Sequence, residues 1–486
     1  MSADVLLPAV VLVPALVATI ALPLPRRLQM PVGIVGAFLS AGLGLWLVAS
    51  VARVGALEHV LAGWAPPLGI ALRADGLSAA FILLTSLVAL GASVYAASEE
   101  DATGRVTGFW PLTFLVWCGL NACFVTGDLF NAYVSLEVLS LAAVGLVALG
   151  GTADAAKAAL RYLVVAVVGS FLVLLAVGYV YAAAGTLDMR LAGEILADDP
   201  SLTRLPLAFA AAGLALKTAL WPLHAWLPPA HAGAPPAVSA LLSALVVKGS
   251  YYLLLRLWLD VFAPDAIIAA VLGVLGTGAV LAGGLVALRQ SHLKRVVAYS
   301  TIAQVGYLFL VFPLLIAAPT TEDRALVLAA AVVMALAHGF AKAALFLAAG
   351  TLVLGTGTDE IDGLVGTSRE QRTVTAAMMI AAISLVGLPI SLGFIAKWEY
   401  LAVAITSGTW WVVIVLLLGS LLAAGYVLRP IAATLRDSDT EEEVGRVDPS
   451  ERPAAQRFIP LALALCSLIG GMFATELIGL SLVGIA

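Results

Sequence analysis

The sequence predicts an all-α, polytopic membrane protein with about fourteen transmembrane helices. Of its 486 residues, 62% are hydrophobic and only 11% are charged, whereas a soluble globular protein carries roughly a quarter charged residues. Its apolar runs are continuous and long enough for helical spans, which need about 20 residues. A membrane β-barrel would instead show alternating segments of about 10 residues. Nothing in the composition suggests nucleic-acid binding.

The apolar segments place the whole chain, residues 1–486, in one integral membrane domain. The first residues lack the basic start of a cleavable signal peptide, so we expect them to begin the first span. Residues 1–108 then hold three helices, 435–456 form a cytoplasmic loop and 457–486 form the last helix. The expected spans are 4–23, 31–53, 77–97, 109–126, 129–149, 160–184, 205–226, 236–259, 266–288, 297–317, 326–354, 373–404, 409–434 and 457–483.

The loop arginines and lysines predict the orientation of these spans. With the N-terminus outside, 15 of the 25 basic residues fall on the cytoplasmic side and 6 on the outer side, as the positive-inside rule requires. One span more or fewer would remove this asymmetry. We therefore expect a multi-pass protein of a bacterial or archaeal cell membrane, with both termini outside.

Two of the spans are predicted to be broken. The seventh ends in the proline-rich stretch 221–229, and the twelfth contains Gly-Leu-Pro at 387–389. Proline removes a helix hydrogen bond and clashes with the preceding turn, and paired interruptions point to inverted repeats with a transport site nearby. Because the breaks are five spans apart, we expect two inverted five-helix repeats, spans 4–8 (109–259) and spans 9–13 (266–434).

Direct repetition between these halves is faint in the sequence. The endings Tyr252…Arg256 of span eight and Tyr426…Arg429 of span thirteen are one weak match. The repeat prediction therefore depends on the helix breaks and not on residue identity.

Four lysines and one glutamate stand out within apolar stretches of the expected spans: Lys217, Lys248, Lys342, Lys397 and Glu137. On insertion scales a charged side chain at the centre of a membrane helix costs about 2.5–3.5 kcal/mol, and such residues mark ion or proton pathways. The sequence therefore predicts a buried path for protons.

Glu137 and Lys217 are the expected partners at one end of this path. Moving a carboxylate toward or away from a buried lysine changes the lysine's affinity for its proton, so a small displacement would load or unload Lys217. In the alternative interpretation, Glu137 is hydrated near the outer interface and Lys217 extends to the cytoplasmic interface.

The remaining candidates lie farther along the chain. Lys248 is deep in span eight, where no interface is near. His338 and Lys342 are four residues apart and share one helix face; histidine titrates near neutral pH and suits a relay, although a buried structural histidine is the alternative. Lys397 follows the second break and either ends the internal path or extends outward.

No motif indicates a bound cofactor or metal. His224 and His231 flank the first break seven residues apart, which is no usual metal spacing. The chain has no P-loop, dinucleotide fingerprint or haem or iron–sulfur motif. We therefore expect a chain without cofactor that uses an ion gradient or is driven by partner subunits. Lys294, at the start of span ten, is expected to serve mainly as a positive-inside anchor.

Four ordered segments carry a family resemblance: LKTALWPLHAWLPPAHAGAPPAVSALLSALVVKGSYYLLLR, LKRVVAYSTIAQVGYL, LAHGFAKAALFLAAGT and GLPISLGFIAKW. They resemble the antiporter-like subunits shared by Mrp-type Na⁺/H⁺ antiporters, respiratory complex I and membrane-bound hydrogenases, over roughly residues 115–429. The resemblance implies fourteen spans, two inverted five-helix repeats with broken helices seven and twelve, and a central polar axis.

The resemblance also implies roles for individual residues. The proton-transfer set is Glu137 as the essential glutamate of helix five, Lys217 and Lys248 as the lysines of helices seven and eight, His338 as the relay of helix eleven, and Lys397 as the terminal residue of helix twelve; the expected supporting residues are Lys342, Arg161, His224 and Lys294.

Three positions depart from the family pattern. Pro229 stands where relatives often have Asp, Ile390 replaces the second Pro of the usual GLPP, and Arg161 stands where many relatives have Lys. None of these positions belongs to the proton-transfer set. The departures therefore affect local detail only.

The expected function is a proton-translocating subunit of a multisubunit Mrp-type antiporter that exchanges Na⁺ or another monovalent cation for H⁺, with other subunits and the lipid bilayer as partners. The length resembles that of a D-type Mrp subunit, and Lys397 argues against the complex I M-type subunit, where Glu is typical. The alternative is a proton-pumping subunit of a complex I-type NADH:quinone oxidoreductase or a membrane-bound hydrogenase. A purely structural subunit is a third interpretation. In the first case the chain is a secondary transporter subunit and no enzyme.

Overall fold

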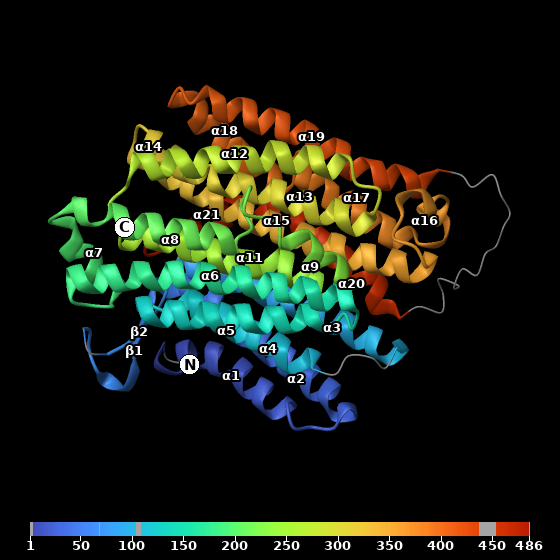
Figure 1. Cartoon of the computed structure of the whole chain (residues 1–486), viewed down its shortest axis with the longest axis horizontal. Helices are drawn as coiled ribbons and strands as arrows, with labels where there is room; N and C mark the ends of the chain where they lie inside the picture. The colour runs from blue at the N-terminus through green and yellow to red at the C-terminus, as the bar shows by residue number, and fades with distance from the viewer. Residues whose placement is uncertain (1–2, 68, 104–107, 437–452, 486) are drawn as a thin grey trace.

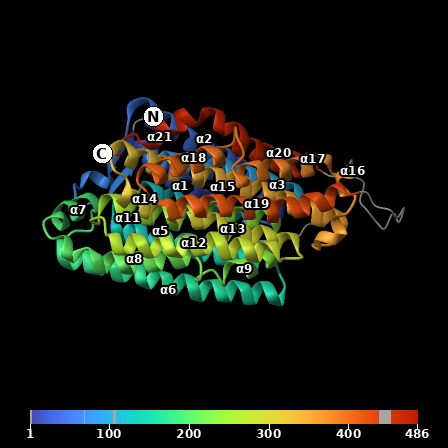
Figure 2. The same ribbon diagram turned by 90° about the horizontal axis from the view of Figure 1, so that it is seen from above.

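The computed structural model describes residues 3–67, 69–103, 108–436 and 453–485. Its helices run along the long axis of the molecule (Figure 1). The strands β1 and β2, the short helix α7 and both termini gather at one end, which we call the hairpin end, and α16 lies at the opposite end, which we call the α16 end (Figures 1 and 2).

The elements have the following bounds. The α-helices are α1 (Ala3–Ala21), α2 (Arg26–Val54), α3 (Gly76–Thr103), α4 (Phe109–Val125), α5 (Leu129–Ala148), α6 (Ala153–Ala184), α7 (Met189–Ala197), α8 (Arg204–Lys217), α9 (Leu227–Gly233), α10 (Pro236–Leu241), α11 (Val247–Asp260), α12 (Ala266–Leu288), α13 (Leu293–Phe309), α14 (Val311–Ala317), α15 (Thr321–Thr356), α16 (Thr367–Glu370), α17 (Arg372–Val386), α18 (Leu392–Thr406), α19 (Trp410–Leu435), α20 (Ala454–Ile469) and α21 (Ala474–Ser481). The strands are β1 (Leu57–Val60) and β2 (Ala71–Ala74), and a π-helical turn, η3 (Leu242–Val246), joins α10 to α11.

The prediction of an all-α polytopic fold is confirmed. Among the described residues, 11 helical segments are long and apolar enough to cross a membrane. The three other expected spans correspond to shorter helices, namely α4, the α8 helix that stops at its break, and α17 followed by α18.

Several helices extend beyond the expected spans. The helix α6 begins at Ala153 and not at 160, because Thr152 caps it by accepting a hydrogen bond from the Ala155 amide at 3.1 Å. The helix α15 likewise begins at Thr321, capped by Thr320, which accepts from the Asp323 amide. Side-chain caps of this kind satisfy free amides at a helix start. An apolar window detects only the part of a helix that lies in hydrocarbon, so it misses these polar first turns.

The loops hold structure that the apolar pattern did not predict. The antiparallel pair β1–β2 follows α2, and α7 follows α6. The polar segment 358–372 contains a 3₁₀ turn (Ile361–Leu364) and α16. Most of the expected cytoplasmic loop, residues 437–452, lies outside the described residues.

Both predicted helix breaks are present. The helix α8 ends at Lys217, Ala219 has a φ of 60°, and a turn leads to α9. The helix α17 ends at Val386, and Gly387 follows with a φ of 85°. A left-handed residue after the last turn is a usual helix stop, and glycine adopts this conformation without strain. The two breaks therefore end their helices through local backbone conformation.

The two halves share one pattern of backbone bridges. In each half, the start of the second helix forms two hydrogen bonds with the loop after the third helix. These bridges lie beside α7 and α16, at opposite ends of the molecule (Figure 1). The symmetry supports inverted repeats, whose boundaries at 109–259 and 266–434 stay a prediction. The hydrogen bonds run from the Leu129 amide to the Leu187 carbonyl (2.8 Å), from Met189 to Gly127 (2.9 Å), from Leu293 to Asp359 (2.8 Å) and from Ile361 to Ser291 (2.9 Å).

Candidate functional site

The first part of the site is an ion pair between α5 and the end of α8. The Lys217 ammonium lies 3.5 Å from Oε1 of Glu137 and donates to the Ser140 hydroxyl at 2.8 Å. The Ser170 hydroxyl of α6 donates to the same carboxylate oxygen. The Lys217 side chain is 3% exposed and the Glu137 side chain 25%. At 3.5 Å the contact is longer than the 2.7–2.9 Å typical of a charge-assisted hydrogen bond, so serine hydroxyls share in holding both groups.

The first break and its neighbours position Lys217. Trp226, after the break, stacks on Tyr162 with ring centroids 4.2 Å apart, and its indole donates to the Leu216 carbonyl at 3.1 Å. A carbonyl freed by the helix end thus gains a partner, as membrane depth requires. On α6, a Cβ at Gly169 would lie 2.9 Å from Cγ of Lys217. Glycine at 169 therefore leaves the space that the lysine stem occupies.

Lys248 is the second buried lysine and follows the π-helical turn. Its ammonium donates to the Ser243 carbonyl at 2.6 Å, and the residue is 1% exposed. The Ser243 hydroxyl in turn lies 2.8 Å from the Thr301 hydroxyl of α13. The Lys248 ammonium therefore bends back toward the π turn, which contains Ser243. A π turn inside a helix frequently marks a functional site.

The helix α15 brings His338 and Lys342 to the same buried region. Lys342 donates to the Val297 carbonyl at 3.1 Å and to the Ser300 hydroxyl. His338 is 1% exposed and lies within electrostatic reach of both Lys248 and Lys342. Among the described residues, neither ring nitrogen of His338 has a hydrogen-bond partner. The ring is therefore held by packing and not by a fixed hydrogen bond.

Lys397, on α18, lies against the second break. Its ammonium donates to the carbonyls of Leu385 (3.0 Å) and Val386 (2.9 Å) and to the Ser420 hydroxyl (3.0 Å). It also lies 4.6 Å from the centre of the Tyr307 ring. The helix C-terminus carries a partial negative charge, so the last carbonyls of α17 serve this cation where a carboxylate serves Lys217.

Of the predicted supporting residues, Lys342 belongs to this buried series and the other three lie outside it. Arg161 is exposed on α6, and His224 is half-buried beside Tyr299. Lys294 is half-buried at the start of α13, where its main-chain amide donates to Asp359 at 3.0 Å. Burial raises the pKa of that Asp359 carboxyl. The supporting roles of these residues stay a prediction.

One histidine near the first break was not among the predicted site residues. His231, on α9, is fully buried and stacks on Phe346 with centroids 4.5 Å apart. It lies within electrostatic reach of Lys342 and Lys248, and among the described residues its ring nitrogens have no hydrogen-bond partner. The sequence signal was available, because His231 follows the prolines of the break.

A second charged cluster lies near the end of the expected span eight. Arg256 is 5% exposed and forms two hydrogen bonds of 2.7 Å with Asp75. Asp75 precedes α3 and is itself buried. Burial alone would raise the pKa of Asp75, but Arg256 lowers it below its usual range. The sequence pattern did not predict this pair, because Asp75 and Arg256 are 181 residues apart in the chain.

Comparison with known proteins decides the family of the chain. The family described as NADH:quinone oxidoreductase/Mrp antiporter, transmembrane, matches residues 126–423. The chain belongs to this family. The N subunit of the NADH-quinone oxidoreductase of Desulforudis audaxviator is 34% identical over 96% of this chain and 94% of that protein. The D-type subunit of the Na⁺/H⁺ antiporter of Bacillus subtilis is 29% identical over 88% of this chain and 85% of that protein.

The solved structures agree with this family assignment. A chain in the structure of the Mrp complex from Dietzia sp. superposes with a TM-score of 0.88 at 25% identity, covering 99% of this chain and 96% of that one. The resemblance expected from the sequence is confirmed. The chain is an antiporter-like membrane subunit of the kind found in Mrp or complex I-type complexes, and its relatives are subunits of multisubunit membrane complexes.

Proposed function

We propose that this chain is the proton-translocating subunit of a multisubunit Mrp-type antiporter, which moves H⁺ against Na⁺ or another monovalent cation. The observation that carries the proposal is the Glu137–Lys217 pair, placed directly before a helix break and held at 3.5 Å with serine hydroxyls around it. A pair of this kind can change its geometry with little backbone movement. Such a change alters how strongly the buried lysine holds its proton.

The proposed proton path runs from this pair to the second break. A proton released from Lys217 passes to Lys248, then through His338 on α15, and leaves at Lys397. Lys342 shares the buried surroundings of His338 and supplies the charge that drives the next transfer. His231 joins this path as an additional relay, since its ring is buried within reach of the same two lysines.

The assembly supplies what the single chain lacks. The proton path needs a cation path to couple with, and we assign that path to the assembled complex of this chain with other subunits in a bacterial or archaeal cell membrane. From the basic residues of its loops, the hairpin end with both termini faces outward. The partly exposed Glu137 carboxylate then controls when protons enter.

A second candidate function is a proton-pumping subunit of a complex I-type or hydrogenase complex. The observation that favours it is the 34% identity to the N subunit of an NADH-quinone oxidoreductase over nearly the full length of both chains. The proton path would be the same in this case. The driving force would be electron transfer in other subunits instead of a cation gradient.

Purification of the native complex tests the choice between the two assemblies. We expect small membrane subunits without redox cofactors to co-purify with the tagged chain. Iron–sulfur and flavin absorbance in the purified complex would contradict the antiporter assignment and establish the redox one.

The proton path is tested by Glu137→Gln in the intact complex, assayed in everted vesicles by the pH change that added Na⁺ produces. The substitution keeps the size of the side chain and removes its charge, so exchange should fall at least about tenfold, the effect of one pKa unit. Glu399→Gln, on α18 two residues from Lys397, is the matched control and should retain exchange. Exchange at the wild-type rate in Glu137→Gln would refute the path.

A further inference from the structure

A closed cluster of charges at the hairpin end is not used by the proton path. Arg256 stands at its centre, with Asp75 bound through both guanidinium nitrogens and Asp260 at 3.3 Å. Its Nε and Nη2 also donate to the Tyr252 hydroxyl at 3.2 and 2.9 Å, and that hydroxyl donates to the Phe124 carbonyl at 2.8 Å. The cluster therefore joins α11 to the start of α3 and the end of α4.

The cluster and Lys248 lie on one stripe of α11. Lys248, Tyr252, Arg256 and Asp260 follow each other at intervals of four residues, and such residues share a helix face. Eight residues separate Arg256 from Lys248, which is about 12 Å along the helix. The stripe thus leads from the buried lysine directly to the hairpin end.

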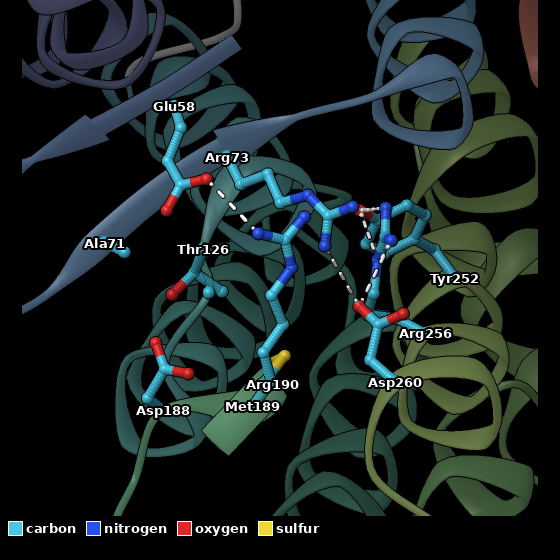
Figure 3. A pocket seen from close by; sticks show the side chains of 11 residues that line it. Glu58, Ala71, Arg73, Thr126, Asp188, Met189, Arg190, Tyr252, Arg256 and Asp260 are labelled. Atoms are coloured by element: carbon cyan, nitrogen blue, oxygen red, sulfur yellow. Dashed lines mark hydrogen bonds and ion pairs between the residues drawn. The ribbon is translucent and has the colours of Figure 1, made fainter. Parts of the chain in front are cut away.

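A small pocket reaches this stripe from the surface (Figure 3). At its rim, Arg190 and Glu58 form an ion pair with side chains 49% and 51% exposed. Farther in, the Arg73 side chain is 16% exposed, and at the bottom the Arg256 side chain is 6% exposed. The pocket has about 20 Å³ of free space, enough for one water molecule. Water from this end can therefore approach Arg256.

The chemistry of the cluster does not suit proton transfer. A guanidinium has five donors and no acceptor, and it keeps its charge at any physiological pH. Arg256 donates to all its partners, so a chain of hydrogen bonds cannot pass a proton through it. Asp75 is occupied as well, since it accepts from Arg256 and from the amide and hydroxyl of Ser78. The lowered pKa of Asp75 keeps this carboxylate ionised and the arginine in place.

We propose that Arg256 is a fixed positive plug, which prevents protons in the hairpin-end pocket from reaching Lys248. Fixed positive groups exclude protons and cations from membrane pores in the same way. Lys248 itself turns away from the plug, toward the Ser243 carbonyl. With the plug in place, protons reach Lys248 only from inside the bundle. Proton transfer through Lys248 therefore stays coupled to the cation path of the complex. This inference rests on the proposed role of Lys248 as a proton carrier.

The proposal is tested by passive proton leak in vesicles that contain the whole complex. After an acid pulse without a cation gradient, internal pH is followed with a trapped pH-sensitive dye. The double variant Asp75→Asn/Arg256→Gln removes both charges together, because leaving one buried charge unpaired destabilises a protein strongly. We expect its leak to rise several-fold. Adding Lys248→Ala should return the leak to the wild-type level.

Two variants separate the plug from a purely structural role. Arg256→Lys keeps the positive charge, so its proton leak should stay at the wild-type level even if the complex is less stable. Arg190→Gln, at the exposed rim, should not leak. The proposal is overturned if the double variant assembles and its proton leak does not rise. It is also overturned if the raised leak persists after Lys248→Ala is added.

The outcome is distinguishable from failure of the proton path itself. Lys248→Ala alone should abolish Na⁺-driven exchange if Lys248 carries protons. If that variant loses exchange while the double variant shows no increase in proton leak, the proposed proton path is supported and the plug is refuted. If Lys248→Ala retains exchange, the path is wrong whatever the leak.

Discussion

The two helix breaks hold a lysine in different ways. At the first, Lys217 is the last residue of α8 and faces Glu137, a carboxylate on another helix. At the second, Lys397 stands on the far half-helix, α18, and donates to the last carbonyls of α17. Among the described contacts of Lys397 there is no carboxylate. One lysine is thus balanced by the charge of a side chain and the other by backbone dipoles.

This difference implies two different ways to change the proton affinity of the two lysines. The proton affinity of Lys217 depends on where one side chain lies, so a rotation of Glu137 is sufficient. The proton affinity of Lys397 depends on the opening of the break itself, since its partners are main-chain groups. The first site suits control by charge, and the second suits control by movement of half-helices. Both lysines pack against glycine, with a Cβ at Gly169 or Gly387 lying 2.9 or 2.8 Å from the lysine stem.

The largest effect should come from removing the donor at the second break. Lys397→Leu removes the donor to the Val386 carbonyl, and a buried carbonyl left without a partner costs about 1–3 kcal/mol. The Leu385 carbonyl also loses Lys397 but still accepts from Gln304 at 3.1 Å. Lys217→Leu leaves Glu137, which is partly exposed and bonded to Ser170. Both variants should lose exchange, but only Lys397→Leu should lower the thermal unfolding midpoint of the purified complex markedly.

Lys397→Gln, which still donates a hydrogen bond, should recover the unfolding midpoint but not the exchange. Equal midpoints for the two leucine variants would contradict the distinction.

The next effect is expected from placing a carboxylate beside Lys397, as Glu137 lies beside Lys217. The Ser420 hydroxyl is neutral and accepts a hydrogen bond from the Lys397 ammonium at 3.0 Å. Ser420→Asp places a permanent counter-charge there, which holds the lysine in its charged form, and vesicle exchange should fall several-fold while assembly persists. Ser420→Ala is the control and should reduce exchange only slightly. Unchanged exchange in Ser420→Asp would show that Lys397 is not a proton carrier.

A smaller effect is expected from the glycine beside Lys217. A Cβ at Gly169 meets Cγ of Lys217 at 2.9 Å and the Gly213 carbonyl at 3.0 Å, so Gly169→Ala must displace the lysine or separate α6 from α8. Exchange should fall severalfold with little loss of assembled complex. Gly178→Ala on the same helix is a matched control, because a Cβ at 178 has no atom within 4 Å. Equal exchange in both variants would argue against tight placement of Lys217.

The smallest effect concerns the bridges that hold each repeat. Burial raises the pKa of Asp128 at the hairpin end and of Asp359 at the α16 end. A raised folded-state pKa means that the folded protein binds the proton more tightly. Stability therefore declines as pH rises from the unfolded value, about 3.9, through the folded one. Asp359→Asn should make the unfolding midpoint slightly less dependent on pH in acid, and an unchanged dependence would contradict this.

Much of the fold could be predicted because hydrocarbon imposes simple rules on sequence. Long apolar runs gave the spans, and prolines at 221–229 and glycine at 387 gave both breaks. The strands β1 and β2 and the helix α7 were missed, since they lie outside the apolar segments where no such rule applies. The bridge symmetry of the two halves was also invisible, because backbone hydrogen bonds need no shared residues.

The site was partly predictable for the same reason. A lysine in an apolar run is conspicuous, so Lys217, Lys248, Lys342 and Lys397 could be found, and all four are buried. The serine hydroxyls that bond Glu137 and Lys217 could not be found, because serine is common in membrane helices. The pairing of Arg256 with Asp75 could not be found either, since the two residues are 181 apart in the chain. Sequence patterns identify costly residues but not their partners.

The π-helical turn η3 has a consequence for how the eighth span is assembled. A π turn holds one more residue than an α turn, and each added residue advances the side chains by about 100° around the axis, at 3.6 residues per turn. The stripe of α11 is therefore rotated out of phase with α10. Deleting one residue in Leu242–Val246 would restore a continuous α-helix and swing Lys248 a quarter-turn away from its present neighbours. The position of this lysine thus depends on an insertion in the backbone rather than on its own side chain.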